Sequence, residues 1–401
     1  MIFFATCAKG TEGALRRELV AMRARSPRGD RGGVWFQGDR EAAMAVCLRS
    51  RVAMRVLVQL AAFEATDADG LYAGARAVDW SEWLTPASTI SVTASVRDSR
   101  TLTHSGYAAL KTKDAVVDAL RDKLGSRPDV APSDPDVSIV LHVAATRAAV
   151  FLDLAGEPLH RRGYRVAMSE APLKETLAAA VLALGGVSVE QPFVDPMGGS
   201  GTLAIEQALA ARNMAPGLHR RHGFERWPTH GEAARAVWRR LCDEARAGIL
   251  PAAPAPIVCR DRFPDTLRAA RANAAAAGVE RDITFEQGDV RGFDPLSTWP
   301  HGTVCTNPPY GERLGGRGTG TGGGVGTREG GPEDRVQQRK LAGLYQGMAD
   351  AFLRLRGWQV VVLSGNPALA RAMRLPPQVC HRLWNGPLEV RLLKWTLSHR
   401  G

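Results

Sequence analysis

The residues whose types and spacing most clearly suggest a chemical role are Asn307, Pro308, Pro309 and Tyr310. They follow residues 303–306, which are predicted to form a strand. Two prolines stiffen this turn and fix its backbone carbonyl groups in place. The side-chain oxygen of Asn307 and the carbonyl of Pro308 can then accept both hydrogens of one amino group. Tyr310 can stack on a planar base. The pattern predicts a device that holds an exocyclic amine, and the alternative is an ordinary proline-rich turn.

A glycine-rich segment, DPMGGSGT, occupies residues 195–202 between a predicted strand and a predicted helix. Gly199 and Gly201 let the backbone approach a ligand closely, and the start of the helix offers free N–H groups. Asp195 can accept hydrogen bonds from a cationic or hydroxylated ligand. The spacing is neither that of a dinucleotide-binding loop nor that of a phosphate-binding loop with a following lysine. A tight strand-to-helix turn without a ligand is the competing interpretation.

Two further acidic residues follow the next two predicted strands. Asp261 comes directly after 257–260, and Asp289 comes shortly after 283–286. Open α/β sheets bind ligands in the crevice outside the carboxyl ends of their strands. Either residue alone could be a helix N-cap. Three acids after three successive strands, with Asp195 as the first, predict one shared ligand site.

The elements that must position these residues begin near residue 170, where predicted strands start to alternate with predicted helices. This alternation indicates an α/β fold with a parallel sheet and right-handed crossovers. A hairpin of 379–383 and 388–397 closes the domain. Two stretches interrupt the pattern: a long insertion at 213–254, and 315–331, where 10 of 17 residues are glycine. We expect the glycine-rich stretch, which follows the turn at 307–310 that could hold an amine, to be a flexible loop.

The first 155 residues show a different, mixed α+β pattern. A small unit is predicted over 1–45, in which 26–33 is expected to be a polar turn. The helix predicted at 105–124 is amphipathic and carries Lys111 and Lys113 on its polar side. These lysines could contact a polyanion, or they could simply belong to a solvated helix face.

The chain of 401 residues is strongly basic, with 52 Lys and Arg against 41 Asp and Glu, a net charge of +11 and a pI near 9.8. This balance favours a polyanionic partner, although coding bias toward arginine would give the same composition. A basic run in the insertion includes Arg220 and Arg221. The six cysteines show no spacing typical of a metal site. Without a long apolar run or a signal peptide, we expect no membrane span and a cytoplasmic location.

The order of DPMGGSGT, Asp261, Asp289 and NPPY resembles that of the class I S-adenosylmethionine-dependent amino-methyltransferases. Longer strings resemble the THUMP-domain RNA guanine-N2 methyltransferases, and among those most closely the bacterial 23S rRNA enzymes. These strings are LHRRGYR at 159–165, LKETLAAA at 173–180, APGLHRRHGFERW at 215–227 and NPPYGERL at 307–314. The segment SGYAALKTKDAVVDAL at 105–120 is similar to the THUMP helix of that family.

The resemblance implies a ferredoxin-like unit at 1–45, an RNA-binding THUMP domain at 46–155 and a Rossmann-like methyltransferase domain at 156–401. It implies that Asp195, Gly199 and Gly201 hold the methionine part of S-adenosyl-L-methionine. It assigns the ribose to Asp261 and the adenine amino group to Asp289, with Lys174 flanking the cofactor site. Lys111, Lys113, Arg220 and Arg221 are the expected RNA contacts, and no metal is expected.

The activity implied is methyl transfer to the N2 amine of a guanine, with 23S rRNA as the leading substrate and a monomer or weak oligomer as the working form. A tRNA guanine-N2 methyltransferase would share the same motifs. Adenine in DNA and a glutamine amide in a protein are rival targets, which the long N-terminal region argues against. Gly198 and Phe263 depart from the family pattern, which has cysteine and a second acid there. They are the support for a further alternative, a non-catalytic RNA-binding or ribosome-assembly factor.

Overall fold

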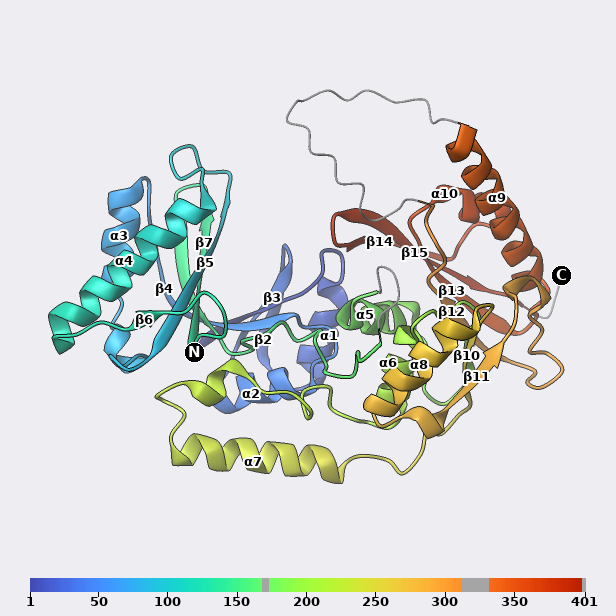
Figure 1. Cartoon of the computed structure of the whole chain (residues 1–401), viewed down its shortest axis with the longest axis horizontal. Coiled ribbons are helices and arrows are strands. Elements are labelled where there is room, and N and C mark those ends of the chain that lie inside the picture. The colour runs from blue at the N-terminus through green and yellow to red at the C-terminus, as the bar shows by residue number, and fades with distance from the viewer. Residues whose placement is uncertain (168–172, 312–331, 399–401) are drawn as a thin grey trace. The chain divides into compact units, whose positions relative to one another are not determined.

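The computed structural model describes residues 1–167, 173–311 and 332–398, and the chain forms two compact units (Figure 1). The first contains residues 1–162 and 215–248, and the second contains 163–214 and 249–401. The glycine-rich stretch expected at 315–331 lies outside the described residues. No described helix is long and apolar enough to cross a membrane.

The first unit is built on one eight-stranded sheet with the strand order β2-β3-β1-β4-β8-β7-β5-β6. Its strands are β1 (Ile2–Thr6), β2 (Arg25–Asp30), β3 (Gly33–Gln37), β4 (Arg55–Glu64), β5 (Thr89–Arg97), β6 (Asp129–Val130), β7 (Val137–Ala144) and β8 (Arg147–Asp153). Its longer helices are α1 (Glu12–Ala21), α2 (Arg40–Arg49), α3 (Ala68–Arg76), α4 (Ser105–Leu124) and α7 (Glu232–Ala247). Figure 1 shows α3 and α4 side by side.

Three features of this unit differ from the expectations. The polar turn expected at 26–33 contains most of strand β2. This strand lies at the edge of the sheet and is largely exposed, so its sequence is polar and shows no apolar alternation that would predict a strand. The insertion contains α7, and residues 215–248 pack in this unit, whereas the domain boundary predicted at 156 stays a prediction. The regions 1–45 and 46–155 share one sheet, because β4 pairs with β1 on one side and β8 on the other.

The second unit contains a seven-stranded sheet with the order β11-β10-β9-β12-β13-β15-β14. Its strands are β9 (Phe193–Asp195), β10 (Ile257–Asp261), β11 (Ile283–Gln287), β12 (Gly302–Thr306), β13 (Trp358–Ser364), β14 (Val379–Asn385) and β15 (Leu388–Thr396). Its helices are α5 (Glu175–Gly185), α6 (Thr202–Ala211), α8 (Pro264–Ala276), α9 (Pro332–Phe352) and α10 (Pro367–Ala372). The strands from β11 to β13 are parallel, as expected, and the closing hairpin is antiparallel.

The strand order of the second sheet reverses at β9. The chain runs from β9 through β10 to β11 and then returns to β12 on the other side of β9. Ligand sites of open α/β sheets lie at the carboxyl ends of the strands beside such a reversal. Asp195 ends β9, and Asn307 directly follows β12. The topology therefore brings the glycine-rich segment and the NPPY turn to the same edge of the sheet.

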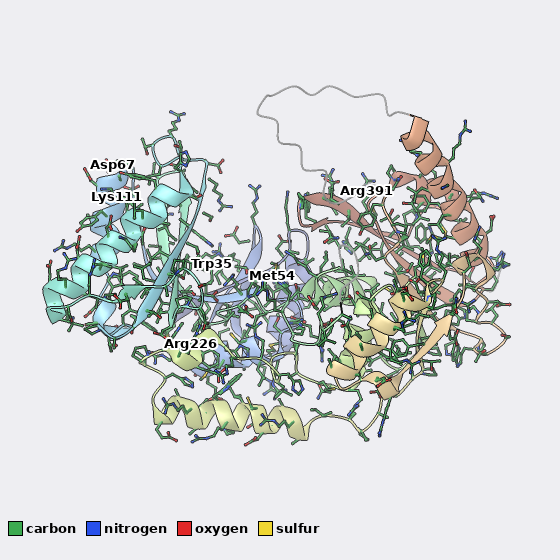
Figure 2. The ribbon with its side chains drawn as sticks, in the orientation of Figure 1. Trp35, Met54, Asp67, Lys111, Arg226 and Arg391 are labelled. Atoms are coloured by element: carbon green, nitrogen blue, oxygen red, sulfur yellow. The ribbon has the colours of Figure 1, made fainter. Side chains whose placement is uncertain are left out.

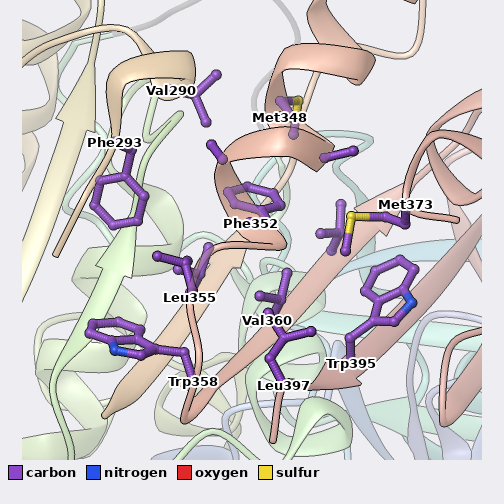
Figure 3. Packing of buried hydrophobic residues seen from close by; sticks show 14 of the residues in the cluster. Val290, Phe293, Met348, Phe352, Leu355, Trp358, Val360, Met373, Trp395 and Leu397 are labelled. Carbon is purple, nitrogen blue, oxygen red and sulfur yellow. The ribbon is translucent and has the colours of Figure 1, made fainter. Parts of the chain in front are cut away.

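Helix α9 is held against this sheet by a large hydrophobic cluster (Figure 3). Met348 and Phe352 of α9 belong to the same cluster as Trp358 and Val360 of β13 and Trp395 of β15. Full burial of each such side chain contributes about 1.5–3 kcal/mol to stability. The cluster fixes α9, and with it Tyr345, which contacts the NPPY turn.

Candidate active site

Asp261 fastens the glycine-rich loop to the end of β10. The backbone N–H of Gly199 donates to Asp261 Oδ2 at 3.0 Å, and the N–H of Phe263 donates to Oδ1 at 3.0 Å. Gly199 has a φ of +53° and Gly201 a φ of +83°, in the left-handed region that favours glycine. A Cβ at Gly201 would also lie 3.0 Å from the Cβ of Ala270. The loop therefore needs glycine at 201 for both conformation and space.

Gly198 is explained by its neighbour Cys259. A Cβ at position 198 would lie 2.4 Å from the Sγ of Cys259, which is fully buried in β10. The sulfur of Cys259 thus fills the space in which a side chain at 198 would begin. This contact gives a physical reason for the first of the two departures from the family pattern.

We expect Gly198→Ala to destabilise the protein by about 1–3 kcal/mol, because the added methyl group overpacks a tight contact. Adding Cys259→Ala should recover much of that loss, since the second change removes the clashing sulfur. Urea unfolding of the two single variants and the double variant measures the coupling. Strictly additive effects of the two substitutions would contradict this account.

Asp195 is a buried brace between neighbouring strands. Its Oδ1 accepts hydrogen bonds from the Thr306 hydroxyl at 2.8 Å and from the Met197 N–H at 3.2 Å. The side chain is 2% exposed, and burial raises its pKa from 3.8 to about 7 despite these bonds. Both bonds go to Oδ1, which leaves Oδ2 for a ligand. The predicted contact with the cofactor stays a prediction, and the bracing of β9 against β12 is an additional role.

The raised pKa of Asp195 predicts a pH dependence of stability. Between about pH 4 and pH 7 the folded protein keeps a proton on Asp195 that the unfolded chain has released. The contribution of Asp195 to the free energy of unfolding therefore falls as pH rises through this window. Asp195→Asn should abolish that decline. The stability of the variant relative to wild type should therefore be higher at about pH 8 than at about pH 5, by on the order of 3 kcal/mol.

Thermal unfolding of both proteins across this pH range measures the difference. The exposed Asp265 offers a matched control, because Asp265→Asn removes a carboxylate outside the buried frame. Equal pH profiles for wild type and Asp195→Asn would show that Asp195 does not hold a proton in the folded state.

Two residues that the sequence analysis did not single out hold the glycine-rich loop in place. Arg165 donates to Glu175 Oε1 at 2.9 Å and to the hydroxyls of Ser200 and Thr202 at 3.3 Å each. Asn273, fully buried on α8, donates to the carbonyl of Ser200 at 3.1 Å. Arg165 stands within the family-like string at 159–165, whereas nothing in the local sequence marks Asn273.

Asn273 also fixes the segment that follows Arg165. Its Oδ1 accepts from the N–H groups of Val166 and Ala167 at 3.0 and 2.9 Å, and its Nδ2 donates to the Ala167 carbonyl at 3.0 Å. One amide side chain thus satisfies four backbone groups from two separate segments. Asn273 therefore ties residues 166–167 to Ser200 of the glycine-rich loop.

Asp289 follows β11, as predicted, and is paired with Arg291. Arg291 donates to both carboxylate oxygens, at 2.9 Å to Oδ1 and 2.6 Å to Oδ2. This side-chain pairing lowers the pKa of Asp289 to about 2. The predicted contact with an adenine amino group requires an oxygen to accept a further hydrogen beside Arg291, and it stays a prediction.

The NPPY turn is held by hydrogen bonds from three sides. The Tyr310 hydroxyl donates to Asn307 Oδ1 at 2.5 Å, and Tyr345 of α9 donates to the Pro309 carbonyl at 2.7 Å. Asn366, the N-cap of α10, donates to the Tyr310 carbonyl at 3.3 Å. A Cβ at Gly365 would lie 2.6 Å from Tyr310 Cγ, so the tyrosine ring rests directly on a glycine backbone. Burial raises the pKa of the Tyr310 phenol, which keeps its proton available for Asn307.

The remaining predicted site residues are Lys174, predicted beside the cofactor, and Lys111, Lys113 and Arg221, predicted to contact RNA. Lys174 is exposed and directly precedes α5, next to Glu175. Lys111 and Lys113 are half-buried on α4, where Figure 2 labels Lys111, and Lys113 pairs with Asp114. Arg221 is exposed.

Arg220 was expected to contact RNA, but the structure gives it a different role. Its guanidinium donates to five backbone carbonyls, and the three shortest bonds go to Glu157 at 2.6 Å, Pro158 at 2.8 Å and Ala155 at 3.1 Å. Burial lowers its pKa. The donors of Arg220 are therefore committed to backbone carbonyls, chiefly those of the segment 155–158, and are not available for RNA. The sequence could not reveal this, because an arginine beside an exposed arginine looks the same in either role.

Comparison with known proteins places this site in a family. The sequence matches an RlmL ferredoxin-like domain over residues 2–57, a THUMP domain over 65–153 and an RMKL-like methyltransferase domain over 162–321. The chain therefore contains an RlmL ferredoxin-like domain, a THUMP domain and an RMKL-like methyltransferase domain, in this order. The family and fold class predicted from the sequence are thereby confirmed.

The chain is similar to the Ribosomal RNA large subunit methyltransferase K/L of Syntrophotalea carbinolica, with 40% identity over 417 residues. That match covers 99% of this chain and 54% of the relative, so the chain spans about half the length of the curated relatives it matches. The structure of this chain is similar to that of SMU.472, described as a methyltransferase complexed with SAH, with a TM-score of 0.85 and 28% identity. The match covers 100% of this chain and 98% of that chain. A predicted N6-adenine-specific DNA methylase from Listeria monocytogenes is similar at a TM-score of 0.83 and 27% identity, covering 99% and 96% of the two chains.

Proposed function

We propose that this methyltransferase transfers a methyl group from S-adenosyl-L-methionine to the N2 amine of a guanine in 23S rRNA. The observation that carries the proposal is the braced NPPY turn at the end of β12, beside the glycine-rich loop that follows β9. The THUMP domain, the net charge of +11 and the name of the 40% identical relative favour ribosomal RNA as the substrate. We propose that it acts in the cytoplasm as a monomer or weak oligomer.

The residues present fit a cationic, hydroxylated cofactor. Asp195 and Asp261 supply carboxylate oxygens at neighbouring strand ends, and oxygens of this kind suit an ammonium group and ribose hydroxyls. Thr176 in the first turn of α5 is 2% exposed, and its hydroxyl has no hydrogen-bond partner within the described parts of the chain. Buried polar atoms rarely stay unsatisfied, so this hydroxyl is available to a ligand atom.

When bound, the cofactor supplies an electrophilic methyl group on a good leaving group, so the protein mainly has to position the reactants. Asn307 Oδ1 has two lone pairs, one of which accepts the Tyr310 hydroxyl while the other can accept an amine hydrogen. The Pro308 carbonyl can accept the second hydrogen, which draws the nitrogen lone pair out of conjugation with the ring. One face of Tyr310 rests on Gly365, and its other face can stack on a base flipped out of its helix. The proton then leaves to water.

The decisive experiment offers labelled S-adenosyl-L-methionine with unmodified 23S rRNA, tRNA and duplex DNA in separate reactions. We expect label in N2-methylguanosine from 23S rRNA. Label in the same nucleoside from tRNA alone would support the proposed reaction but make tRNA the substrate. Label in N6-methyladenine from DNA would contradict both the proposed reaction and the proposed substrate. Cofactor binding without label in any nucleic acid would point to a protein target. A chain that binds no cofactor would support the non-catalytic RNA-binding role.

A further inference from the structure

The sheet of the first unit carries a set of aromatic side chains on the face opposite α4. Along β7, Ile139 and Leu141 are fully buried on the side that α4 contacts, whereas Val140 and His142 on the other side are half-buried. The antiparallel register places Val140 beside Phe151 of β8. This second face therefore has its own apolar residues, distinct from the main core.

Phe4, Trp35, His142 and Phe151 form two layers on this face, which we call the aromatic face (Figure 2 labels Trp35). Phe4 and Phe151 lie against the sheet and are almost completely buried. The Trp35 ring lies over both, with centroids at 4.7 Å from Phe4 and 6.0 Å from Phe151, and His142 lies 5.2 Å from Phe151. Trp35 and His142 are thus the outer layer, and both residues are half-buried.

A polar contact fixes the orientation of Trp35. Its indole N–H donates at 2.9 Å to Oδ2 of Asp30, the last residue of β2. This bond lowers the pKa of Asp30, so the carboxylate is charged at neutral pH. Burial and the nearby Arg97 lower the pKa of His142, so its imidazole is neutral there. The outer layer therefore consists of two planar, uncharged rings held in place on a rigid sheet.

Positive charge surrounds these rings. The segment 23–31 at the edge of the sheet contains a single acid, Asp30, and four exposed arginines, Arg23, Arg25, Arg28 and Arg31. Arg28 pairs in register with Trp35, and the charges of Arg28 and Arg97 both act on Asp30. Arg97 ends β5, several strands away from β2, so arginines approach the aromatic face from both sides.

We infer that the aromatic face and the flanking Arg28 and Arg97 form a binding surface for single-stranded RNA. Aromatic rings that stack on bases, next to arginines that contact phosphates, are the combination by which sheets bind single strands. The inference rests on the proposed function, because it deepens the RNA-binding role by naming the surface. It also spans the two N-terminal domains, since Phe4 and Trp35 belong to the ferredoxin-like domain and His142 and Phe151 to the THUMP domain.

Two simpler roles compete with this inference. Trp35 could serve only to cover Phe4 and Phe151, and the arginines could serve only to keep the edge strand β2 from pairing with another chain. Neither role requires Arg97, which ends a strand near the opposite edge of the sheet, or an affinity for RNA. Variants that keep the packing but remove stacking or charge can therefore separate the roles.

The test measures binding of the full chain to a labelled oligouridylate of about 12 nucleotides, a length suited to such surfaces, by fluorescence anisotropy. We expect Trp35→Leu, which retains apolar bulk, to weaken binding about tenfold, and Trp35→Phe to stay within about threefold of wild type. Arg28→Ala combined with Arg97→Ala should weaken binding and reduce the salt slope by about 0.7 for each arginine–phosphate pair that is removed. Arg239→Ala on α7, which removes a positive charge elsewhere in the unit, should leave binding unchanged.

The inference is overturned if the Trp35→Leu and double arginine variants are folded, as judged by thermal unfolding, and bind the oligonucleotide like wild type. It is also overturned if these variants lose affinity only for an acidic peptide, which would make the surface a protein-binding one. Methyl transfer to rRNA, measured in parallel, separates this inference from the proposed function. If wild type transfers the methyl group and the variants bind RNA like wild type, the proposed function is supported and the RNA-binding role of the aromatic face is rejected.

Discussion

Asn307→Ala is expected to lower methyl transfer by at least about a hundredfold while leaving cofactor binding nearly unchanged. Asn307 supplies the side-chain oxygen that accepts an amine hydrogen, and groups aimed at the reacting atom in this way commonly contribute that much. The residue follows β12, whereas the loop fastened by Asp261 follows β9, so the substitution leaves the cofactor side of the site intact. Single-turnover transfer of labelled methyl, with calorimetric titration of the cofactor, measures both quantities.

Tyr310→Phe serves as the matched control for Asn307→Ala. It keeps the ring on Gly365 and removes only the hydroxyl that donates to Asn307. We expect a smaller loss of transfer, about tenfold, because the amide loses one orienting hydrogen bond but keeps its oxygen. A fully active Asn307→Ala variant would remove the NPPY turn from the reaction and with it the amine-holding mechanism.

Asn273→Ala is expected to destabilise the protein by about 3 kcal/mol or more and to weaken cofactor binding. The side chain is fully buried and bonds to four backbone groups. The alanine would remove these bonds, and of the four groups the Val166 N–H keeps a bond to the Tyr164 carbonyl. A buried polar group that loses its partner costs about 1–3 kcal/mol. The carbonyl of Ser200 is one of these groups, so the glycine-rich loop loses a fixed point at the same time.

Urea unfolding and cofactor titration of Asn273→Ala test both parts of this prediction. Asn273→Asp refines the test, because a carboxylate can still accept from Val166 and Ala167 but cannot donate to the two carbonyls. Its effect should fall between those of wild type and alanine. Arg271→Ala, two residues away on the exposed side of α8, should have little effect. A stable Asn273→Ala protein with normal cofactor affinity would show that the loop holds its shape without this residue.

The sequence predicted well which polar residues stand at the strand ends of the second unit, because the determinants there are local. Each of Asp195, Asp261 and Asn307 stands at the end of an apolar run, and alternating strands and helices imply that such ends meet. The structure adds what depends on distant partners. Thr306 bonded to Asp195 and Asn273 bonded to Ser200 are pairs far apart in the chain, and no spacing rule connects them.

Polar elements account for most of what the sequence did not reveal. Strand β2 carries RSPRGD, which has the composition of a turn, and it is a strand only because β3 is beside it. Arg220 and Arg221 are adjacent and identical in type, yet one is committed to carbonyls and the other is exposed. Charge and propensity describe a residue, whereas its partners are decided by the fold around it.

Strand β4 also determines how the N-terminal half can be divided. The ferredoxin-like match ends at residue 57 and the THUMP match begins at 65, so the border between the two families falls within β4. A fragment that starts at the THUMP border would leave β8 as a bare, largely apolar edge, open to pairing with other chains. The two domains therefore match separate family models but share one hydrogen-bonded sheet. They should melt in a single transition, and they can be exchanged between relatives only as a pair.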